Sequence, residues 1–412
     1  MKNLNSKPVT RCQISKSNKL ESLMFLGYLP PVNTLRKIGS TPTEEISFPA
    51  ELLYCKKSKL AQLGCIVDKK ILFPYTYPYT SSTTKILREN FADLYKDANK
   101  IIKLDKNDLV VDVGSNDGNL LSNFKDKHRV LGVTPEKIGE IAIKKGIPTI
   151  IDYFDSTTAS KIINKYGKAK VITATNVFAH IDDINNIVKS IKKTLKEDGV
   201  FISESHYLLP LIQTVQYDTI YHEHLRYYSL ESLNFLLKKH DLEIFNVKEI
   251  STHGGSIRVY ASRKGKYKIS NNVKKQFKKE KIHLNKKSFE KFKKNVVSSK
   301  LNLFNLIKKI KDNNKNIFGV GAPSRASTLI NYLGLDRDII DCVLEINGSY
   351  KIGNYIPGTK IPILDEKILS KKMPDFLILF SWHIKDELKK NLRKKGFKGK
   401  FIIPLPYPTI EK

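Results

Sequence analysis

The stretch that decides the fold reads Leu109-Val110-Val111-Asp112-Val113-Gly114-Ser115-Asn116-Asp117-Gly118-Asn119-Leu120-Leu121. Its first five residues are mostly apolar and β-branched, which predicts a buried strand. Gly114 and Gly118 follow, and apolar residues then recur at helical spacing, so we expect a tight turn and the start of a helix. Because glycine has no Cβ atom, such a turn lets a ligand approach bare backbone.

The composition of this turn favours one kind of ligand. An adenosyl group has room beside Gly114 and Gly118, and the free N–H groups of a helix start offer donors. The dinucleotide fingerprint is Gly-x-Gly-x-x-Gly, and this turn lacks its middle glycine, so NAD is the less favoured cofactor. The turn resembles motif I of the class I S-adenosylmethionine-dependent methyltransferases. That resemblance implies cofactor contacts at Asp112, Gly114, Ser115, Asn116, Asp117 and Gly118.

The alternative interpretation is a purely structural turn, because any parallel α/β domain needs tight turns after its strands. The surrounding pattern is of that class. A helical pattern runs from Thr83 to about Lys103, and strand patterns alternating with helices follow at residues 130–133, 148–151, 171–175 and 199–204. Such alternation implies a parallel sheet that binds ligands at the carboxyl ends of its strands. The predicted fold class is therefore α/β.

Three more strand ends carry candidate cofactor contacts. A carboxylate normally follows the second strand, because both its oxygens can accept from a ribose diol. Here Thr134 stands at that position, so either Thr134 makes one hydrogen bond or Glu136 reaches back. Phe154 covers an adenine ring or belongs to the core. Asn176 follows the fourth strand, where a methyltransferase places residues that face its cofactor.

Length and composition bound the remaining possibilities. A chain of 412 residues has room for two or three domains, each with its own core. No stretch offers the roughly 20 apolar residues of a membrane span, and the first residues lack the apolar block of a signal peptide. Four scattered cysteines agree with a reducing compartment. We expect a cytoplasmic protein.

The net charge of +31 allows a second class of function, binding to nucleic acid or to an anionic membrane. A nucleic-acid surface predicts clustered basic residues with interleaved aromatics. The lysines are instead spread over most of the chain, alongside abundant Asn and Ile. A compositional bias explains them, so the expected partner is a small molecule rather than a nucleic acid or a membrane.

The segment Asp218–Ser229 is the richest in chemistry. It holds two histidines around a glutamate and contains no lysine, so the compositional bias does not explain it. The spacing His-x-His lacks a third metal ligand and differs from His-Glu-x-x-His. An acid–base role is more economical, because imidazole titrates near neutral pH and a carboxylate can orient it. The alternative is that these residues cap a helix and satisfy buried backbone.

Here the resemblance becomes specific. Tyr221-His222-Glu223-His224, downstream of the glycine turn and of Asn176-Val177-Phe178-Ala179-His180, resembles the sugar C-methyltransferases of deoxysugar biosynthesis. That family has an N-terminal zinc-ribbon-like module, a central Rossmann-like class I methyltransferase domain and a second, C-terminal Rossmann-like α/β domain. The resemblance implies domains at residues 1–80, 81–268 and 269–412.

The N-terminal module departs from the family pattern. It is expected to be small and irregular, because prolines interrupt any long periodic pattern. Cys12 and Cys55 fall at two of the family's four zinc positions, and Ser15 and Ser58 occupy the other two. A neutral hydroxyl is a poor zinc ligand. We therefore expect no zinc and no other metal.

The resemblance also implies a reaction. The substrate is a nucleotide-activated keto-deoxysugar, whose C–H beside the ketone an enzyme base can remove, and the resulting enolate attacks the sulfonium methyl group. By the family's precedent, His224 with Glu223 is the base. Tyr221, with Tyr77 or Tyr79 from the N-terminal module, polarises the keto oxygen.

Several further residues are implied as substrate ligands, and the chain offers them from two regions. The turn Thr252-His253-Gly254-Gly255 matches the family, and a second strand, glycine turn and helix start begins at residue 316. A diphosphate is expected near Arg325 or Lys351. The full implied set is His222, His253, Arg258, Arg325 and Lys351.

Two alternatives keep the family and change the activity. In the first, the methyl acceptor is not a sugar carbon but an oxygen or nitrogen nucleophile. In the second, the chain is a catalytically inactive scaffold. Thr134 and the two lost zinc cysteines are the features that suggest the scaffold.

Overall fold

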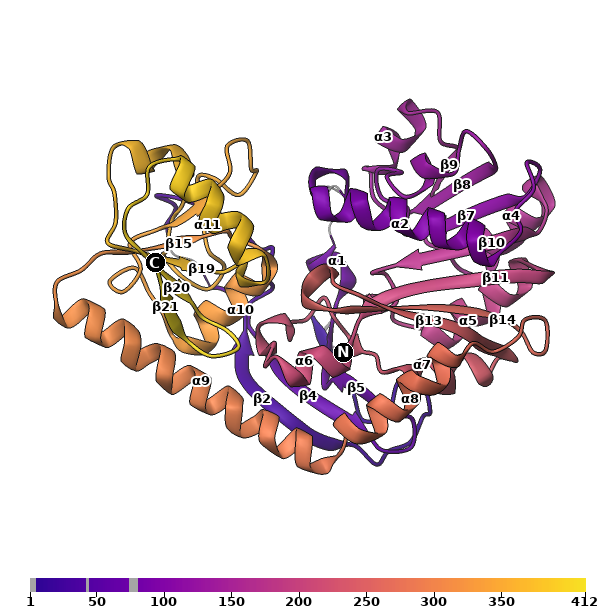
Figure 1. The fold of residues 1–412 in the computed structure, drawn as a ribbon, viewed down its shortest axis with the longest axis horizontal. Coiled ribbons are helices and arrows are strands. Elements are labelled where there is room, and N and C mark those ends of the chain that lie inside the picture. The colour runs from indigo at the N-terminus through magenta and orange to yellow at the C-terminus, as the bar shows by residue number, and fades with distance from the viewer. Residues whose placement is uncertain (1–4, 42–43, 74–80) are drawn as a thin grey trace.

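The computed structural model describes residues 5–41, 44–73 and 81–412. Tyr77 and Tyr79, expected to hold the keto oxygen, lie outside these residues. Figure 1 shows two α/β units on either side of an antiparallel sheet, with the long helix α9 (Lys286–Asp312) running along one edge of the molecule.

The central unit is built on a seven-stranded sheet of order β13-β14-β11-β10-β7-β8-β9. Its strands are β7 (Leu109–Val113), β8 (Arg129–Thr134), β9 (Thr149–Ile151), β10 (Ala169–Thr175), β11 (Leu195–His206), β13 (Leu242–Ile250) and β14 (Ser256–Arg263). The five strands from β11 to β9 run parallel, and β14 is antiparallel to β11. The α/β class is confirmed.

Helices cover both faces of this sheet because alternate residues of each strand point to opposite faces. Val110, Val171 and Val200 pack with Phe91 of α2 (Lys85–Ile101) in one cluster, whereas Val111 belongs to the cluster on the other face. The helices of that second face are α4 (Ser156–Tyr166), α5 (Ile184–Thr194) and α7 (Leu230–Lys238). The remaining short helices of the unit are α3 (Gly139–Lys144) and α6 (Leu208–Gln213).

The helix expected directly after the glycine turn is absent. Residues 114–120 form turns, and only a 3-10 helix, η2 (Leu121–Asn123), follows. Gly114 and Gly118 both have positive φ, at 77° and 78°, and Asn116 has φ 50°. Three positive-φ residues so close together prevent a helix from starting here.

The N-terminal module is a sheet and not an irregular segment. Its four strands have the order β12-β5-β4-β2, and all neighbours are antiparallel. They are β2 (Glu21–Leu29), β4 (Phe48–Cys55), β5 (Leu60–Leu63) and β12 (Arg226–Tyr227); the short strands β1 (Ser6–Pro8) and β6 (Cys65–Val67) pair separately, and α1 (Lys69–Leu72) follows. Because β12 comes from the histidine-rich segment, the module and the central unit share a sheet.

The C-terminal unit has a six-stranded sheet of order β18-β16-β15-β19-β20-β21, parallel except for β21. Its elements are β15 (Ile317–Val320), α10 (Ser324–Leu333), β16 (Val343–Glu345), β18 (Ile363–Asp365), β19 (Phe376–Leu379), η6 (Trp382–Ile384), α11 (Lys385–Lys394), β20 (Lys400–Ile403) and β21 (Thr409–Glu411). Two helices, α8 (Asn271–His283) and α9, connect it to the central unit.

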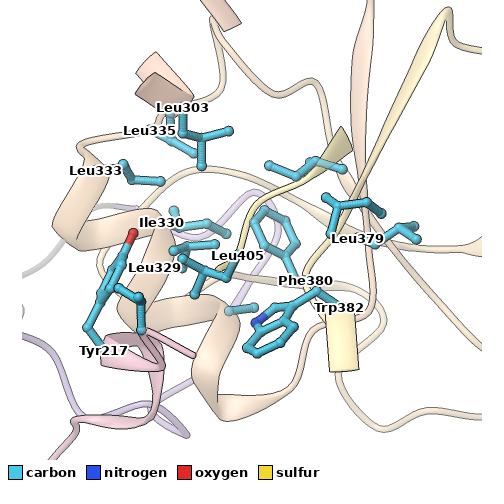
Figure 2. Close-up of a cluster of buried hydrophobic side chains, with 14 of the residues drawn as sticks. Tyr217, Leu303, Leu329, Ile330, Leu333, Leu335, Leu379, Phe380, Trp382 and Leu405 are labelled. Atoms are coloured by element: carbon cyan, nitrogen blue, oxygen red, sulfur yellow. The ribbon is translucent and has the colours of Figure 1, made fainter. Parts of the chain in front are cut away.

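The three units share one buried cluster. Figure 2 shows Tyr217, from the 3-10 helix η3 (Tyr217–Thr219), beside Leu329 of α10, with Phe380 and Trp382 in the same cluster. The strand pair β3 (Arg36–Lys37) and β17 (Asn354–Tyr355) joins the N-terminal module to the C-terminal unit. Among the helices of the described residues, none combines the length and apolar character needed to cross a membrane.

The packing of the glycine turn makes a first testable prediction. A Cβ atom on Gly118 would lie 2.9 Å from the Cβ atom of Ala142 and 2.7 Å from Cδ1 of Ile147, whereas Gly146, with nearly the same φ, has nothing within 4 Å. We expect Gly146→Ala to cost about 1 kcal/mol of unfolding free energy from backbone strain. Gly118→Ala should cost ~1–3 kcal/mol more, because the turn must move away from α3.

Urea unfolding of both variants measures this difference. Equal losses for Gly118→Ala and Gly146→Ala would show that the turn does not depend on its contact with α3.

Candidate functional site

The glycine turn and the histidine-rich segment meet at the same edge of the central sheet. The loop after β10 contacts both of them. A Cβ atom on Gly114 would collide with the side chain of Val177, and the ring of His180, three residues further on, lies 5.2 Å from the ring of His224. The carboxyl ends of β7 and β10 are the ligand-binding edge of a parallel sheet.

Asp112 is buried inside this edge. Its Oδ1 atom accepts a hydrogen bond from the Thr173 hydroxyl at 2.6 Å, which ties β7 to β10. Burial raises the pKa of Asp112 to about 7, although the Thr173 hydrogen bond acts in the opposite direction.

The polar side chains of the turn have different surroundings. Asn116 Oδ1 accepts from the backbone N–H of Ser81 at 2.9 Å, and Asp117 Oδ1 accepts from its hydroxyl at 2.7 Å. Asp117 also pairs with Lys145 at 3.3 Å. Burial opposes ionisation of Asp117, but hydrogen bonds from Ser82 and Ser81 and the charge of Lys145 lower its pKa overall. Asn116 and Asp117 therefore hold Ser81, in the chain that leads into α2.

Ser115 is different, because its buried hydroxyl has no hydrogen-bond partner among the described residues. An unsatisfied buried hydroxyl costs roughly 1–3 kcal/mol. The Ser115 oxygen faces β8, because a Cβ atom on Gly132 would lie 2.5 Å from it, so Ser115 packs the turn against the sheet.

A carboxylate is present at the end of β8 after all. The Thr134 hydroxyl donates to Glu136 Oε2 at 2.5 Å, so threonine holds the side chain of the glutamate two residues later. Phe154 is buried in the hydrophobic cluster of α4 and α5. Of its two predicted places, over an adenine ring or in the core, it occupies the core.

Four aromatic side chains form the chemical centre of the site. The Tyr221 ring lies 4.3 Å from the ring of His224, and the rings of His180 and His206 lie 5.2 and 6.4 Å from it. His180 Nδ1 donates to the backbone oxygen of Glu223 at 2.7 Å. His206, at the end of β11, was not predicted from the sequence.

The hydrogen bonds of His224 determine which of its nitrogens is basic. Nδ1 lies 3.1 Å from the backbone oxygen of Thr219, which can only accept, so Nδ1 carries the proton. Nε2 then has the lone pair and accepts from the Tyr221 hydroxyl at 3.3 Å. The protein thus presents a basic nitrogen beside a phenol.

All these imidazoles are neutral at neutral pH. Burial lowers the pKa of His180 to about 4 and that of His206 to about 3. For His224, burial and the neighbouring histidines keep the pKa well below its usual value. Burial raises the pKa of Tyr221, so its hydroxyl keeps its proton. The arrangement can accept a proton at His224 and donate a hydrogen bond from Tyr221.

The expected pairing of Glu223 with His224 is wrong. Glu223 Oε1 accepts from the Asn33 amide at 2.6 Å, and both ring nitrogens of His224 are bound to Thr219 and Tyr221. A backbone carbonyl therefore orients the imidazole in place of the neighbouring carboxylate.

His222 also departs from its predicted role in substrate binding. Its ring packs 5.7 Å from the ring of Phe48, and Nε2 lies 3.3 Å from the backbone oxygen of Pro49. It is 1% exposed. The side chain therefore fills the contact between this segment and β4 of the N-terminal module.

His253 lies beside a predicted cofactor contact. Its Nε2 atom is 3.5 Å from Asn176 Nδ2, and both residues have positive φ. Burial and the charge of Arg325 lower the pKa of His253 to about 4. The structure thus brings together two residues predicted for different ligands.

Arg258 is not available to a substrate. It is fully buried in β14, and its Nε atom donates to Glu204 at 2.9 Å. Its other nitrogens bind Asp97 at 2.9 Å, Asp93 at 3.1 Å and Asn90 at 2.9 Å. Its role is to attach α2 to the sheet.

Arg325 is likewise committed to protein partners. Its guanidinium binds the Asp218 carboxylate through Nε at 2.8 Å and Nη2 at 2.9 Å, and Nη1 lies 3.1 Å from Nδ1 of His383. The diphosphate contact expected at Arg325 is therefore wrong. Lys351 donates one hydrogen bond, of 2.5 Å, to the backbone oxygen of Ala322 in the second glycine turn.

The degenerate zinc positions do come together. Cys12 Sγ lies 3.1 Å from the Ser58 hydroxyl, and Cys55 Sγ lies 3.5 Å from the Ser15 hydroxyl. Two thiols hydrogen-bonded to two hydroxyls do not fit the four thiolate or imidazole ligands of a structural zinc. The described residues contain no group of three or more His, Cys, Asp or Glu side chains that could hold a metal ion.

Family models match three successive parts of the chain. They describe a putative zinc binding domain over residues 12–73, a methyltransferase domain over residues 85–247 and a C-methyltransferase C-terminal domain over residues 251–406. The chain is 27% identical over 412 residues to C-methyltransferase NovU of Streptomyces niveus. The match covers 98% of this chain and 97% of the relative.

Solved structures match a smaller part. An S-adenosylmethionine-dependent methyltransferase from Clostridium acetobutylicum covers 45% of this chain and 94% of its own, with 19% identity and a TM-score of 0.35. The YcgJ protein from Bacillus subtilis covers 43% and 100%, with 15% identity and a TM-score of 0.33.

The raised pKa of Asp112 predicts a pH dependence of stability. Its folded pKa of about 7 lies above the value of about 3.9 in an unfolded chain. The folded state therefore favours the protonated carboxyl, and stability falls as the pH rises between those two values. Asp112→Asn should remove this decline, which amounts to at most about 4 kcal/mol.

Urea unfolding at pH 5 and pH 8 measures the effect as the difference between wild type and variant. Glu280, whose pKa burial also raises to about 7, is common to both proteins and cancels. Thr173→Val should extend the decline to higher pH, because the ionised carboxylate loses its donor and the folded pKa of Asp112 rises further. Parallel pH profiles for wild type and Asp112→Asn would contradict the assignment.

Proposed function

Because the chain is an S-adenosylmethionine-dependent methyltransferase of the C-methyltransferase family, we propose that it methylates a carbon atom of a nucleotide-activated keto-deoxysugar through an enolate. One observation carries the proposal. The backbone oxygen of Thr219 holds the proton of His224 on Nδ1, so that Nε2 is a base beside the hydroxyl of Tyr221.

The residues present at the strand ends fit S-adenosylmethionine. Gly114 turns the chain at the end of β7 with positive φ, and Thr134 holds the Glu136 carboxylate at the end of β8. We assign ribose binding to Glu136, since its second oxygen is an acceptor for a diol. Asn176 completes the set from β10. When bound, the cofactor supplies an electrophilic methyl group.

The protein's own contribution is the handling of one proton. The C–H bond beside a ketone becomes acidic when a donor stabilises the developing oxyanion. The Tyr221 hydroxyl is that donor once its proton turns from His224 Nε2 to the substrate oxygen, which also frees Nε2. His224 Nε2 accepts the proton and forms an imidazolium whose Nδ1–H remains bonded to Thr219. The resulting enolate carbon would be the nucleophile for the methyl group of bound S-adenosylmethionine, whose thioether would leave as the S–C bond breaks.

The positions of His253 and Lys351 support substrate binding from two sides. His253 lies next to Asn176, on the cofactor edge of the sheet. Lys351 uses one hydrogen bond on Ala322, so its ammonium group keeps further N–H donors for a diphosphate near the second glycine turn. Burial lowers the pKa of Lys351, and the charges of Glu345 and Glu223 partly restore it.

Deuterium exchange tests the proposal directly. Without methyl donor, the wild-type enzyme should exchange the hydrogen on the carbon beside the carbonyl of a nucleotide-activated keto-deoxysugar. His224→Ala should reduce exchange and methyl transfer at least about 100-fold, the scale of general base catalysis. The affinity for S-adenosylmethionine, measured by calorimetry, should stay nearly unchanged.

His222→Ala is the matched control. It removes an imidazole from the same segment, but one that packs on Phe48, so it should lower stability and leave exchange intact. Undiminished exchange in His224→Ala would reject the base. Methyl transfer without exchange in wild type would favour an oxygen or nitrogen acceptor, and no calorimetric binding of S-adenosylmethionine would favour a scaffold.

We further propose that the N-terminal module folds without zinc. The hydrogen bonds between Cys12 and Ser58 and between Cys55 and Ser15 join the two loops that a zinc ion would join. Burial opposes ionisation of Cys55, yet hydrogen bonds from Ser15 and Ser58 lower its pKa to about 7. The hydroxyls thus take over the stabilising role of the metal.

Metal analysis checks this proposal. The purified protein should contain no stoichiometric zinc, and EDTA should leave its melting temperature unchanged. The double variant Ser15→Cys/Ser58→Cys completes four thiols and should bind one zinc per chain, with a higher melting temperature. Stoichiometric zinc in the wild type, with a lower melting temperature after chelation, would contradict it.

A further inference from the structure

A guanidinium from the C-terminal unit reaches the hydrogen-bond partners of two histidines in the site. Arg325, at the start of α10, is 6% exposed. Its Nε and Nη2 atoms hold Asp218, and Nη2 also lies 3.5 Å from Gln216 Oε1. The Trp382 indole adds a second donor to Asp218 Oδ2 at 2.8 Å and lies under the guanidinium, 4.9 Å from its carbon.

Asp218 connects this arginine to His224. The two aspartate oxygens accept three hydrogen bonds, all from the C-terminal unit, so the carboxylate is fixed in position. The next residue in η3, Thr219, supplies the carbonyl that keeps the proton of His224 on Nδ1. Displacement of Asp218 therefore displaces the group that determines the His224 tautomer.

Gln216 connects the same arginine to His206. Its Nε2 atom donates to the backbone oxygen of Gly254 at 2.6 Å and to the Thr214 hydroxyl at 2.7 Å, which orients the amide. Oε1 consequently faces His206 Nε2, at 3.3 Å, and that nitrogen must be the donor. The lone pair of His206 lies on Nδ1, which has no partner within the described part of the chain.

We propose that Arg325 is a positioning residue for the methyl-transfer site, holding His224 through Asp218 in the tautomer that the chemistry uses. The inference rests on the proposed function for its meaning in catalysis. The geometry of this chain of contacts does not depend on which acceptor the enzyme methylates. The C-terminal unit is thereby part of the catalytic apparatus.

The alternative is that the Asp218–Arg325 pair only stabilises the contact between units. A buried ion pair is weak support for stability, because desolvation of the two charges offsets most of their attraction. The pair contributes more to geometry than to stability, since the bidentate fork of Arg325 fixes both the position and the orientation of the Asp218 carboxylate. The charge of Arg325, after burial, also lowers the pKa of His206 and His383, which keeps these rings neutral.

Histidine tautomers can be read directly by NMR. We suggest long-range 1H–15N correlation spectra of ¹⁵N-histidine-labelled full-length protein, with the two residues assigned from His224→Ala and His206→Ala. In the wild type, His224 should carry its proton on Nδ1 and His206 on Nε2. Arg325→Lys keeps the charge but loses the fork, and should give mixed tautomers at His224. His206 should keep its proton on Nε2, because Gly254 and Thr214 still orient Gln216.

Tyr355→Leu is the matched control. Tyr355 helps to attach the C-terminal unit elsewhere, because its hydroxyl accepts from the backbone N–H of Gly39 at 3.1 Å. This variant should lower the melting temperature and leave both tautomers and kcat as in the wild type. Arg325→Lys should lower kcat about 10–100-fold, the scale of a small misplacement of a catalytic group, with the affinity for S-adenosylmethionine unchanged.

A wild-type tautomer at His224 in Arg325→Lys, or a loss of kcat no greater than in Tyr355→Leu, would overturn the proposal. Where Arg325→Lys does not fold, Trp382→Phe removes only the indole donor to Asp218 and is subject to the same criteria at His224. A third outcome separates the two proposals. If Arg325→Lys alters the His224 tautomer but the wild type exchanges no deuterium into the keto-sugar, the proposed function is rejected and the positioning role stands.

Discussion

The site depends on one hydrogen bond, from Nδ1 of His224 to the backbone oxygen of Thr219. A carbonyl oxygen cannot donate, so this contact assigns the ring proton without any carboxylate partner. The carbonyl belongs to a single 3-10 turn that is held from three directions. Arg325 and Trp382 bind Asp218, and Tyr227 donates from its hydroxyl to the same Thr219 oxygen at 3.0 Å. Side chains of the C-terminal unit and of β12 therefore determine the state of one imidazole.

The loop after β10 explains why the glycine turn and this imidazole act on the same ligand. Val177 fills the space that a side chain at position 114 would need, and His180 packs against His224 with its ring tilted. The glycine is thus required by packing as well as by any ligand. The two halves of the site, one for a donor and one for an acceptor, are adjacent because residues 176–180 contact both.

Local pattern was sufficient for the α/β class and for the five parallel strands of the central sheet, because runs of apolar, β-branched residues can be recognised from neighbouring residues alone. It was insufficient where the partner lies far away in the chain. Arg258 and Arg325 both have the composition of anion ligands, but their carboxylates come from α2, β11 and η3. Residues 222–224 show a second limit. Consecutive side chains point to different neighbours, so proximity in sequence wrongly paired Glu223 with His224. His206 was overlooked although it ends β11, the position where a parallel sheet binds ligands.

The histidines of the site can lie close together only because none is charged. The ring of His224 lies 5.2 Å from the ring of His180 and 6.4 Å from that of His206. Two imidazolium ions so close in a buried site would repel strongly. Burial removes that problem by favouring the neutral form. The same neutrality has a chemical consequence. Each neutral ring has a lone pair on one nitrogen, although burial makes each a weaker base, and among these rings only His224 has its lone pair against a phenol. The direction of proton transfer is therefore built into the packing before a substrate arrives.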